Sequence, residues 1–124
     1  MTLATAYAET CRVALAAEQA ASLAETDGWA HVDRGQVHSD WDMLYQAVKA
    51  LRHQSEASSP AIQELMAQHY AIVSRFYVPS RQAYMGMSLF YGEDPDMRTF
   101  HDGYGHGFVD FLSASMQVFA ERNL

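Results

Sequence analysis

Residues 76–107, FYVPSRQAYMGMSLFYGEDPDMRTFHDGYGHG, contain three helix breaks and many of the chain's aromatic rings. The breaks fall at Val78-Pro79-Ser80, at residues 92–95 and at the glycine-rich run 103–107, and each has one or two rings beside it. Eleven of the chain's 15 aromatic residues lie within residues 70–119. This layout indicates short helices that fold around something flat and apolar, either their own core or a ligand.

Length and composition restrict the class of protein. A chain of 124 residues is expected to form one domain with a sizeable core. A formal charge of −7 with only eight Lys and Arg has the wrong sign for a phosphate backbone, so we expect no direct nucleic-acid partner. No apolar run is long enough for a membrane span, and no basic-then-apolar start indicates a signal peptide. With one cysteine, Cys11, no internal disulfide forms, and we expect a cytoplasmic protein.

Hydrophobic periodicity predicts an all-α fold. No segment alternates apolar and polar residues as a strand would, whereas the helical pattern i, i+3, i+4, i+7 recurs along the chain. We expect a compact bundle of five to seven helices in a single domain, 1–124, with residues 1–37 forming an N-terminal helix and a lid-like segment. The predicted helices cover residues 2–26, 40 to about 53, 60 to the Val78-Pro79 stop, 81–91, 95 to about 103, and a last helix from about Tyr104.

Capping residues set the expected helix ends. Ser39, Ser59 and Ser80 are predicted N-caps, and Ser59 is followed by a proline at the first helical position. Asp94-Pro95 is a second pair of this kind, a predicted N-cap followed by a proline. Gly92 is the expected left-handed residue after the fourth helix.

Catalytic and metal-binding patterns are absent from the sequence. Of six histidines, His101 and His106 are the closest pair, and their spacing of five matches no zinc site. We find no Gly-x-Ser-x-Gly motif and no phosphate-binding loop, and Cys11 is expected to fill space in the core. The sequence therefore predicts no cofactor, no metal and no enzyme activity.

His69 interrupts an otherwise apolar helix face, and two interpretations remain open for it. A core histidine would bond to a carbonyl or a carboxylate, because buried polar groups are normally paired. Alternatively, His69 lies on a pocket wall and offers an orienting hydrogen bond to a ligand. The aromatic and methionine residues carry the same two alternatives, core or pocket, and Met85, Met87 and Met97 would supply deformable surface to a pocket.

Several short motifs resemble those of a known family. They are Phe76-Tyr77, Tyr84-x-Gly86, Tyr91-x-x-Asp94-Pro95 and Asp102-x-x-x-x-Gly107 followed by an aromatic helix. In order and spacing they resemble the TipAS-type antibiotic-recognition domain of MerR-type thiopeptide regulators and albicidin-binding resistance proteins, over roughly residues 38–122. Ser59-Pro60 and His69 also occupy matching positions. The resemblance implies a globin-like all-α domain that encloses a large natural-product antibiotic in a cleft between helices.

The resemblance also bears on how a ligand would be held. Where thiopeptide regulators have a cysteine after the Phe-Tyr pair that captures the drug covalently, this chain has Pro79. That difference implies non-covalent binding and favours an albicidin-like ligand, a linear chain of aromatic amides, over a thiopeptide. No basic winged-helix segment precedes the motifs, so we expect sequestration of the drug, with resistance as the result, and not promoter control.

The leading hypothesis is therefore a non-enzymatic antibiotic-binding protein, a monomer or weak homodimer. An alternative is a ligand-sensing module that acts through a protein partner or a homodimer, as the Ala-rich residues 2–26 allow. An enzyme that degrades the drug has no catalytic constellation to support it. The expected ligand-binding residues are Trp29, Trp41, His69, Phe76, Tyr77, Tyr84, Met85, Tyr91, Phe100, Tyr104 and Phe108.

Overall fold

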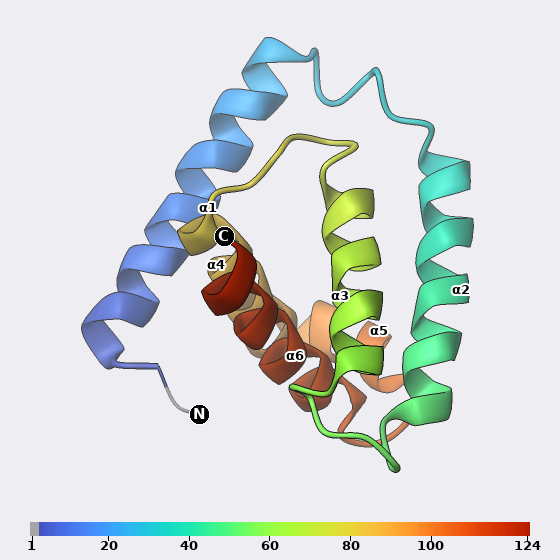
Figure 1. The fold of residues 1–124 in the computed structure, drawn as a ribbon. Helices are drawn as coiled ribbons and strands as arrows, with labels where there is room; N and C mark the ends of the chain where they lie inside the picture. The colour runs from blue at the N-terminus through green and yellow to red at the C-terminus, as the bar shows by residue number, and fades with distance from the viewer. Residues whose placement is uncertain (1–2) are drawn as a thin grey trace.

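The computed structural model describes residues 3–124, and within this range the chain forms six α-helices and no strand (Figure 1). The all-α prediction is confirmed. The helices are α1 (Thr5–Glu25), α2 (Arg34–Leu51), α3 (Pro60–Val73), α4 (Arg81–Glu93), α5 (Pro95–Asp102) and α6 (Phe108–Asn123). None of the helices in residues 3–124 has the length and apolarity that crossing a bilayer requires.

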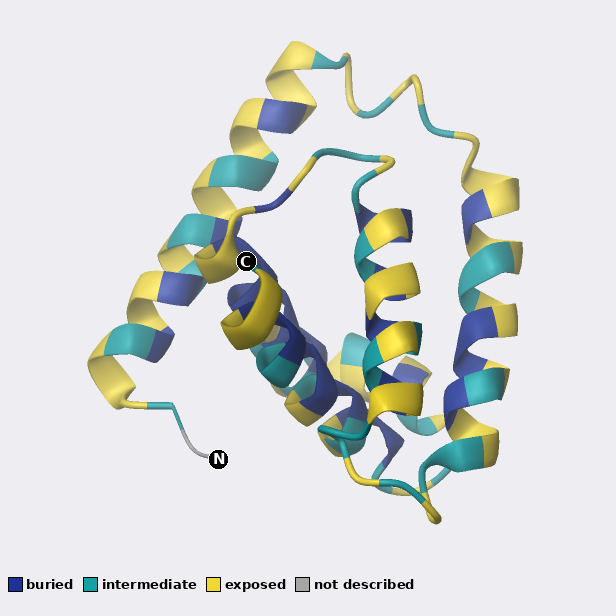
Figure 2. Ribbon diagram, viewed as in Figure 1, coloured by how far each residue is buried: buried dark blue, intermediate teal, exposed yellow. Residues whose placement is uncertain are grey.

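Helix α4 is the centre of the arrangement. It packs against α1 on one side and against α5 and α6 on the other, while α2 and α3 pair with each other and α3 reaches the rest through α6. Buried positions turn toward the middle of the bundle on every helix (Figure 2). Helices α1 and α2 stand apart, and residues 26–33 span the distance between them (Figure 1). The bundle is therefore two helical units that share a core at one end and separate at the other.

Helix α1 lies directly on the backbone of α4. A Cβ placed on Gly86 would lie 2.3 Å from the carbonyl oxygen of Cys11 and 3.0 Å from the Cβ of Leu15. Real Cβ atoms do not approach a carbonyl this closely, so glycine is required at the crossing. Cys11 is fully buried here and fills space, as expected from the sequence.

Polar contacts fasten α1 to both ends of α4. At the end of α4, Arg12 donates from Nε and Nη2 to the two carboxylate oxygens of Glu93, over 2.9 and 2.6 Å. At the start of α4, Glu18 accepts from the backbone N–H of Ser80 over 3.0 Å and from the Ser80 hydroxyl. Since these groups are partly exposed to water, which screens their charges, each pair contributes little to stability. Their main effect is to fix the register of α1 along α4.

The start of α2 differs from the prediction. Helix α2 begins at Arg34, where the Asp33 carboxylate accepts from the backbone N–H of Gln36 over 3.1 Å and serves as the N-cap. The predicted cap, Ser39, lies inside the helix and is exposed. The earlier start adds Val37, which is buried, to the apolar face of α2.

The end of α3 and the connections around α4 also differ. Helix α3 ends at Val73 and does not reach the Val78-Pro79 stop, because Phe76 belongs to a turn in which its N–H donates to the carbonyl of Val73. Gly92 lies within α4 and is not left-handed, since Asp94 leaves the helix in an extended conformation. Helix α6 begins at Phe108, after the predicted start at Tyr104.

The other predicted caps have mixed outcomes. Ser80 and Asp94 accept hydrogen bonds from the backbone N–H groups of Ala83 and Met97, which confirms both. Ser59 does precede α3, with Pro60 at the first helical position, but its hydroxyl accepts no hydrogen bond from that helix.

We predict that Gly86→Ala lowers the free energy of unfolding by about 1–3 kcal/mol, because the added methyl forces α1 away from α4. Urea denaturation followed by circular dichroism measures the change. Gly35→Ala is the matched control, since its nearest neighbour would lie 3.7 Å away, an ordinary contact. Equal stability of the two variants would contradict the close crossing.

Candidate functional site

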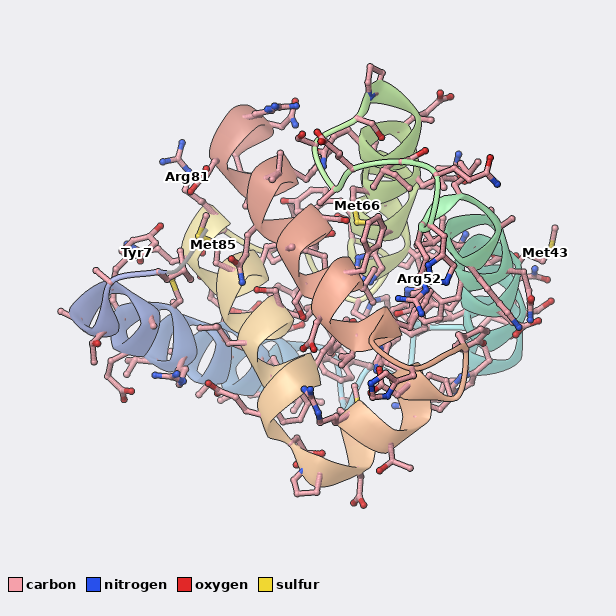
Figure 3. All side chains as sticks on the ribbon, turned by 90° about the horizontal axis from the view of Figure 1, so that it is seen from below. Tyr7, Met43, Arg52, Met66, Arg81 and Met85 are labelled. Carbon is pink, nitrogen blue, oxygen red and sulfur yellow. The ribbon has the colours of Figure 1, made fainter. Side chains whose placement is uncertain are left out.

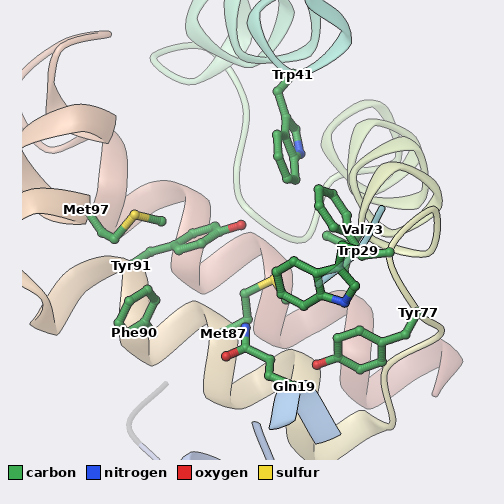
Figure 4. A pocket seen from close by; sticks show the side chains of 10 residues that line it. Gln19, Trp29, Trp41, Val73, Tyr77, Met87, Phe90, Tyr91 and Met97 are labelled. Carbon is green, nitrogen blue, oxygen red and sulfur yellow. The ribbon is translucent and has the colours of Figure 1, made fainter. Parts of the chain in front are cut away.

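An apolar pocket of about 220 Å³ lies between α1 and the α2–α3 pair (Figure 4). We call it the aromatic pocket. Six of its ten lining residues carry Trp, Phe or Tyr rings, and none is charged. The lining residues are Gln19, Trp29, Trp41, Val73, Phe76, Tyr77, Met87, Phe90, Tyr91 and Met97.

A second pocket of about 230 Å³ adjoins the first, and we call it the Asp42 pocket. It shares Trp41, Tyr91 and Met97 with the aromatic pocket, so the two pockets lie side by side, and we call them together the groove. The remaining lining residues are His38, Asp42, Tyr45, Phe100, His101 and Tyr104. The groove therefore has an uncharged end and an end that carries a carboxylate.

Trp29 is held at the groove by a backbone conformation that is uncommon for a bulky residue. Asp27, Gly28 and Trp29 are all left-handed, with φ of 53°, 67° and 64°. The indole Nε1–H of Trp29 donates to the Ser22 hydroxyl over 2.9 Å, and its backbone N–H donates to Thr26 Oγ1 over 3.1 Å. Such a conformation persists only where its surroundings fix it, and this is typical of functional sites.

Phe76 joins the two tryptophans into a continuous wall. Its ring meets Trp29 edge-on at 5.0 Å between centroids and stacks on Trp41 at 5.9 Å. His31 supports this turn by donating from Nε2 to the carbonyl oxygens of Arg75 and Phe76, which the end of α3 has left free. The early end of α3 is thus what turns Phe76 toward the groove.

Two polar atoms at the aromatic pocket lack partners. The indole Nε1 of Trp41 and the hydroxyl of Tyr77 are shielded from solvent and form no hydrogen bond within residues 3–124. Burial, followed by the nearby charge of Glu18, raises the pKa of Tyr77 to about 12, so its hydroxyl keeps its proton. Buried polar groups are normally paired. These two groups are available to hydrogen-bond with the carbonyl groups of a ligand.

A histidine–tyrosine network lies beneath the groove. His101 donates from Nδ1 to the Met97 carbonyl over 2.7 Å, so its Nε2 accepts from the Tyr45 hydroxyl over 3.0 Å. His69 bonds through Nδ1 to the Tyr84 hydroxyl over 2.8 Å, and its Nε2 lies 3.5 Å from the hydroxyls of Tyr45 and Tyr91.

Burial keeps both imidazoles uncharged. It lowers the pKa of His69 to about 3, with a further contribution from His101, and it also lowers the pKa of His101. His69 is fully buried and lines neither pocket, as a core histidine does. Its firm partner is a tyrosine hydroxyl, whereas the sequence-based alternative expected a carbonyl or a carboxylate.

The structure divides the predicted ligand-binding residues into two groups. Trp29, Trp41, Phe76, Tyr77 and Tyr91 line the aromatic pocket, and Phe100 and Tyr104 line the Asp42 pocket together with Trp41 and Tyr91. The others line neither of these pockets and are buried in the core: His69, Tyr84, Met85 and Phe108.

Several lining residues were not predicted. On α4, Phe90 and Tyr91 lie three and four residues after Met87, so the three share one face of the helix, and this periodicity was a usable signal. Met85 points instead into the core (Figure 3). Gln19 and Asp42 had no such signal, because each reaches the groove through packing between distant helices.

No group of three or more His, Cys, Asp or Glu side chains within residues 3–124 is arranged to hold a metal ion. The chain's single thiol, Cys11, lies outside both pockets, and burial raises its pKa. The groove instead offers aromatic rings, methionine side chains and a few hydrogen-bonding groups.

We predict that folding stability falls as the pH drops below about 6.5, by about 1.4 kcal/mol per pH unit for each histidine that stays neutral in the fold. The unfolded chain takes up protons there, whereas buried His69 does not until about pH 3. Urea denaturation between pH 7.5 and 5.5 measures the free energy of unfolding at pH values above those at which carboxyl groups take up protons. His69→Gln should reduce the slope, with the exposed His53→Gln as control. A flat profile would contradict the neutral network.

Most of the motifs singled out in the sequence have a structural role here. Tyr84 belongs to the buried network, and Gly86 forms the close crossing. Asp94 caps α5, and the Asp102 carboxylate accepts from the backbone N–H of Val109 over 2.9 Å. Gly107, left-handed with a φ of 80°, starts α6. These motifs maintain the frame of the groove.

Comparison with known proteins identifies the family. The model of the TipAS antibiotic-recognition domain matches residues 6–119, nearly the whole chain. No curated protein and no solved structure matched the chain. A family match of this extent, together with the all-α fold, means that the chain belongs to the TipAS antibiotic-recognition domain family.

Proposed function

We propose that this protein binds a large aromatic antibiotic non-covalently in the groove and confers resistance by sequestering it. Membership in an antibiotic-recognition family supports a small-molecule antibiotic as the ligand. The observation that carries the proposal is the wall formed by Trp29, Phe76 and Trp41 along an uncharged pocket. Aromatic ligands stack on such surfaces with a gain beyond simple burial.

The shape of the groove favours an extended ligand. Pockets of about 220 and 230 Å³ are each small for a drug-sized molecule, but a long and narrow ligand could occupy both neighbouring pockets. A linear chain of aromatic amides, as in albicidin, fits this description. Its rings would stack along the wall, and its amide carbonyls would accept from Trp41 Nε1–H and the Tyr77 hydroxyl.

Non-covalent capture is supported by the placement of the reactive groups. The position of the capturing cysteine in thiopeptide regulators is Pro79 here, and the only thiol of the chain is buried between α1 and α4. A thiolate is the reactive form of cysteine, and burial disfavours it. Thiopeptides are therefore the less favoured ligand class.

Binding without turnover is supported by the state of the two buried histidines. His69 and His101 are neutral, and their ring nitrogens are engaged with tyrosine hydroxyls or a carbonyl. No histidine in the network is hydrogen-bonded to a serine or a cysteine, the pairing that nucleophilic catalysis needs. The network instead holds the floor of the groove in one geometry.

The alternative, a ligand-sensing module that acts through a protein partner or a homodimer, is favoured by exposed apolar side chains on α1. Val13 is 60% exposed and Leu23 is 38% exposed. Light scattering with and without ligand separates the two functions. A sequestering protein keeps its mass on binding, whereas the alternative requires a change of assembly when a ligand or a partner is present.

Titration with albicidin and with a thiopeptide, followed by tryptophan fluorescence, tests the proposal. The chain's two tryptophans both line the groove, so we expect saturable quenching by albicidin and a weaker response to the thiopeptide. Mass spectrometry after long incubation should recover intact ligand and unmodified protein. No quenching at micromolar protein, or a protein–drug adduct, would refute the proposal.

We further predict that Phe90→Ala weakens albicidin binding about tenfold while the protein stays folded. Phe90 lines the aromatic pocket, yet it is 42% exposed, so its truncation removes little core packing. Met43→Ala is the matched control, because Met43 is exposed on α2 and points away from the bundle (Figure 3). Equal affinities of the two variants for albicidin would place the ligand elsewhere.

A further inference from the structure

The Asp42 pocket differs in charge from the rest of the groove. Five of its nine lining side chains carry Trp, Tyr or Phe rings, two are histidines, and the only carboxylate is that of Asp42. No lysine or arginine lines it. We propose that this pocket is a cation-selective subsite, which takes a protonated or quaternary amine carried by an aromatic ligand. The inference deepens the proposed function, because it names the chemical group that one end of the ligand would carry.

The carboxylate is fixed beside the rings and is left without a positive partner. Tyr104 donates its hydroxyl to Oδ1 of Asp42 over 2.6 Å, and within residues 3–124 no other group donates to this carboxylate. Burial, and then Asp42 itself, raises the pKa of Tyr104 to about 12, so this hydrogen bond persists at neutral pH. The hydrogen bond thus fixes the Asp42 carboxylate at the mouth of the pocket.

Other carboxylates near the groove are already paired. Asp40, on the same helix, contacts Arg75 at 2.6 Å, and Glu93 contacts Arg12 at 2.6 Å. Asp42 has no such ion pair among the described residues. A cation supplied by a ligand would complete at Asp42 the pairing that arginines provide elsewhere.

The rings supply the second half of a cation site. An ammonium group within about 6 Å of a ring centroid is attracted to the ring face. Phe100 is 55% exposed at the mouth, and its centroid lies 6.2 Å from that of Tyr104. The rings of Tyr45 and Tyr104 meet edge to face, with their centroids 5.2 Å apart, so the two rings face the pocket at different angles. One ammonium can therefore contact ring faces and the carboxylate together.

His101, the buried histidine of the pocket, does not oppose a cation. His101 donates its only N–H away from the pocket, to the Met97 carbonyl, and its Nε2 accepts from Tyr45. His38 is exposed at the rim. The overall charge of −7 adds long-range attraction for a positive ligand. A ligand with a basic amine is therefore favoured at this end, and one with a carboxylate there is repelled.

Matched small probes test the subsite without the antibiotic. Benzyltrimethylammonium carries the cation, neopentylbenzene is its neutral isostere, and phenylmethanesulfonate is its anionic counterpart. The indole N–H signals of the two tryptophans in ¹H–¹⁵N spectra report binding, and Trp29→Phe assigns them. We expect the cation to shift the Trp41 signal saturably. Its affinity should be at least about fivefold higher than that of either other probe.

Asp42→Asn keeps the size of the side chain and an acceptor for Tyr104 but removes the charge. We expect it to weaken benzyltrimethylammonium binding about fivefold and to leave the neutral probe unchanged. Phe100→Leu removes a ring but keeps an apolar side chain. It should also weaken binding of the cation and leave binding of the neutral probe unchanged. Glu64→Gln is the matched control for the loss of one negative charge, because Glu64 is exposed on α3 and forms no ion pair within residues 3–124.

Equal binding of the cation and the neutral isostere, or equal effects of Asp42→Asn and Glu64→Gln, would overturn the inference. So would cation binding that shifts only the Trp29 signal, because Trp29 does not line the Asp42 pocket. Failure of this kind is distinguishable from failure of the proposed function. In that case the albicidin titration would still show saturable quenching, and Phe90→Ala would still weaken it.

Discussion

The rest of the structure depends on the crossing of α1 over α4 at Gly86. Because Gly86 has no Cβ, the backbone of α1 rests on that of α4, and Arg12 and Glu18 fasten it to the two ends of α4. Helix α1 is thereby held apart from α2, with which it makes no extensive contact. The segment 26–33 must then span the space between them, and this places Trp29 at the groove. A protein interior is normally close-packed, so an apolar groove maintained in this way indicates a ligand.

The groove combines a rigid floor with walls of two kinds. Below it, the rings of His69 and His101 contact three tyrosine hydroxyls and one backbone carbonyl, and burial keeps this network uncharged. Such a network specifies one geometry when its members are satisfied. Above it, one end offers uncharged rings and two unpaired polar atoms, and the other offers rings beside the Asp42 carboxylate. The groove is thus suited to distinguish the two ends of an extended molecule.

Much of the fold was predictable from the sequence, because helical periodicity and capping are local. Ser80 and Asp94 cap as predicted, since a side chain and a backbone N–H three residues on suffice. The start of α2 was missed because Asp33 competes with Ser39 as a cap, and only packing of Val37 decides between them. Aromatic density indicated the groove, but it did not separate Tyr84 in the core from Tyr91 at the wall. The positions of Gln19 and Asp42 depend on contacts between helices distant in sequence, which no local pattern specifies.

The central claim is that an aromatic antibiotic lies in this groove. Nuclear Overhauser effects between albicidin and methyl-labelled methionines test it most directly, because the chain has seven methionines in distinct environments. Met87 and Met97 line the groove, Met116 is buried in α6, and Met43 is exposed on the outer side of α2. The account predicts contacts from the ligand rings to Met87 and Met97 and none to Met116 or Met43. Contacts to Met43 without contacts to Met87 and Met97 would contradict it.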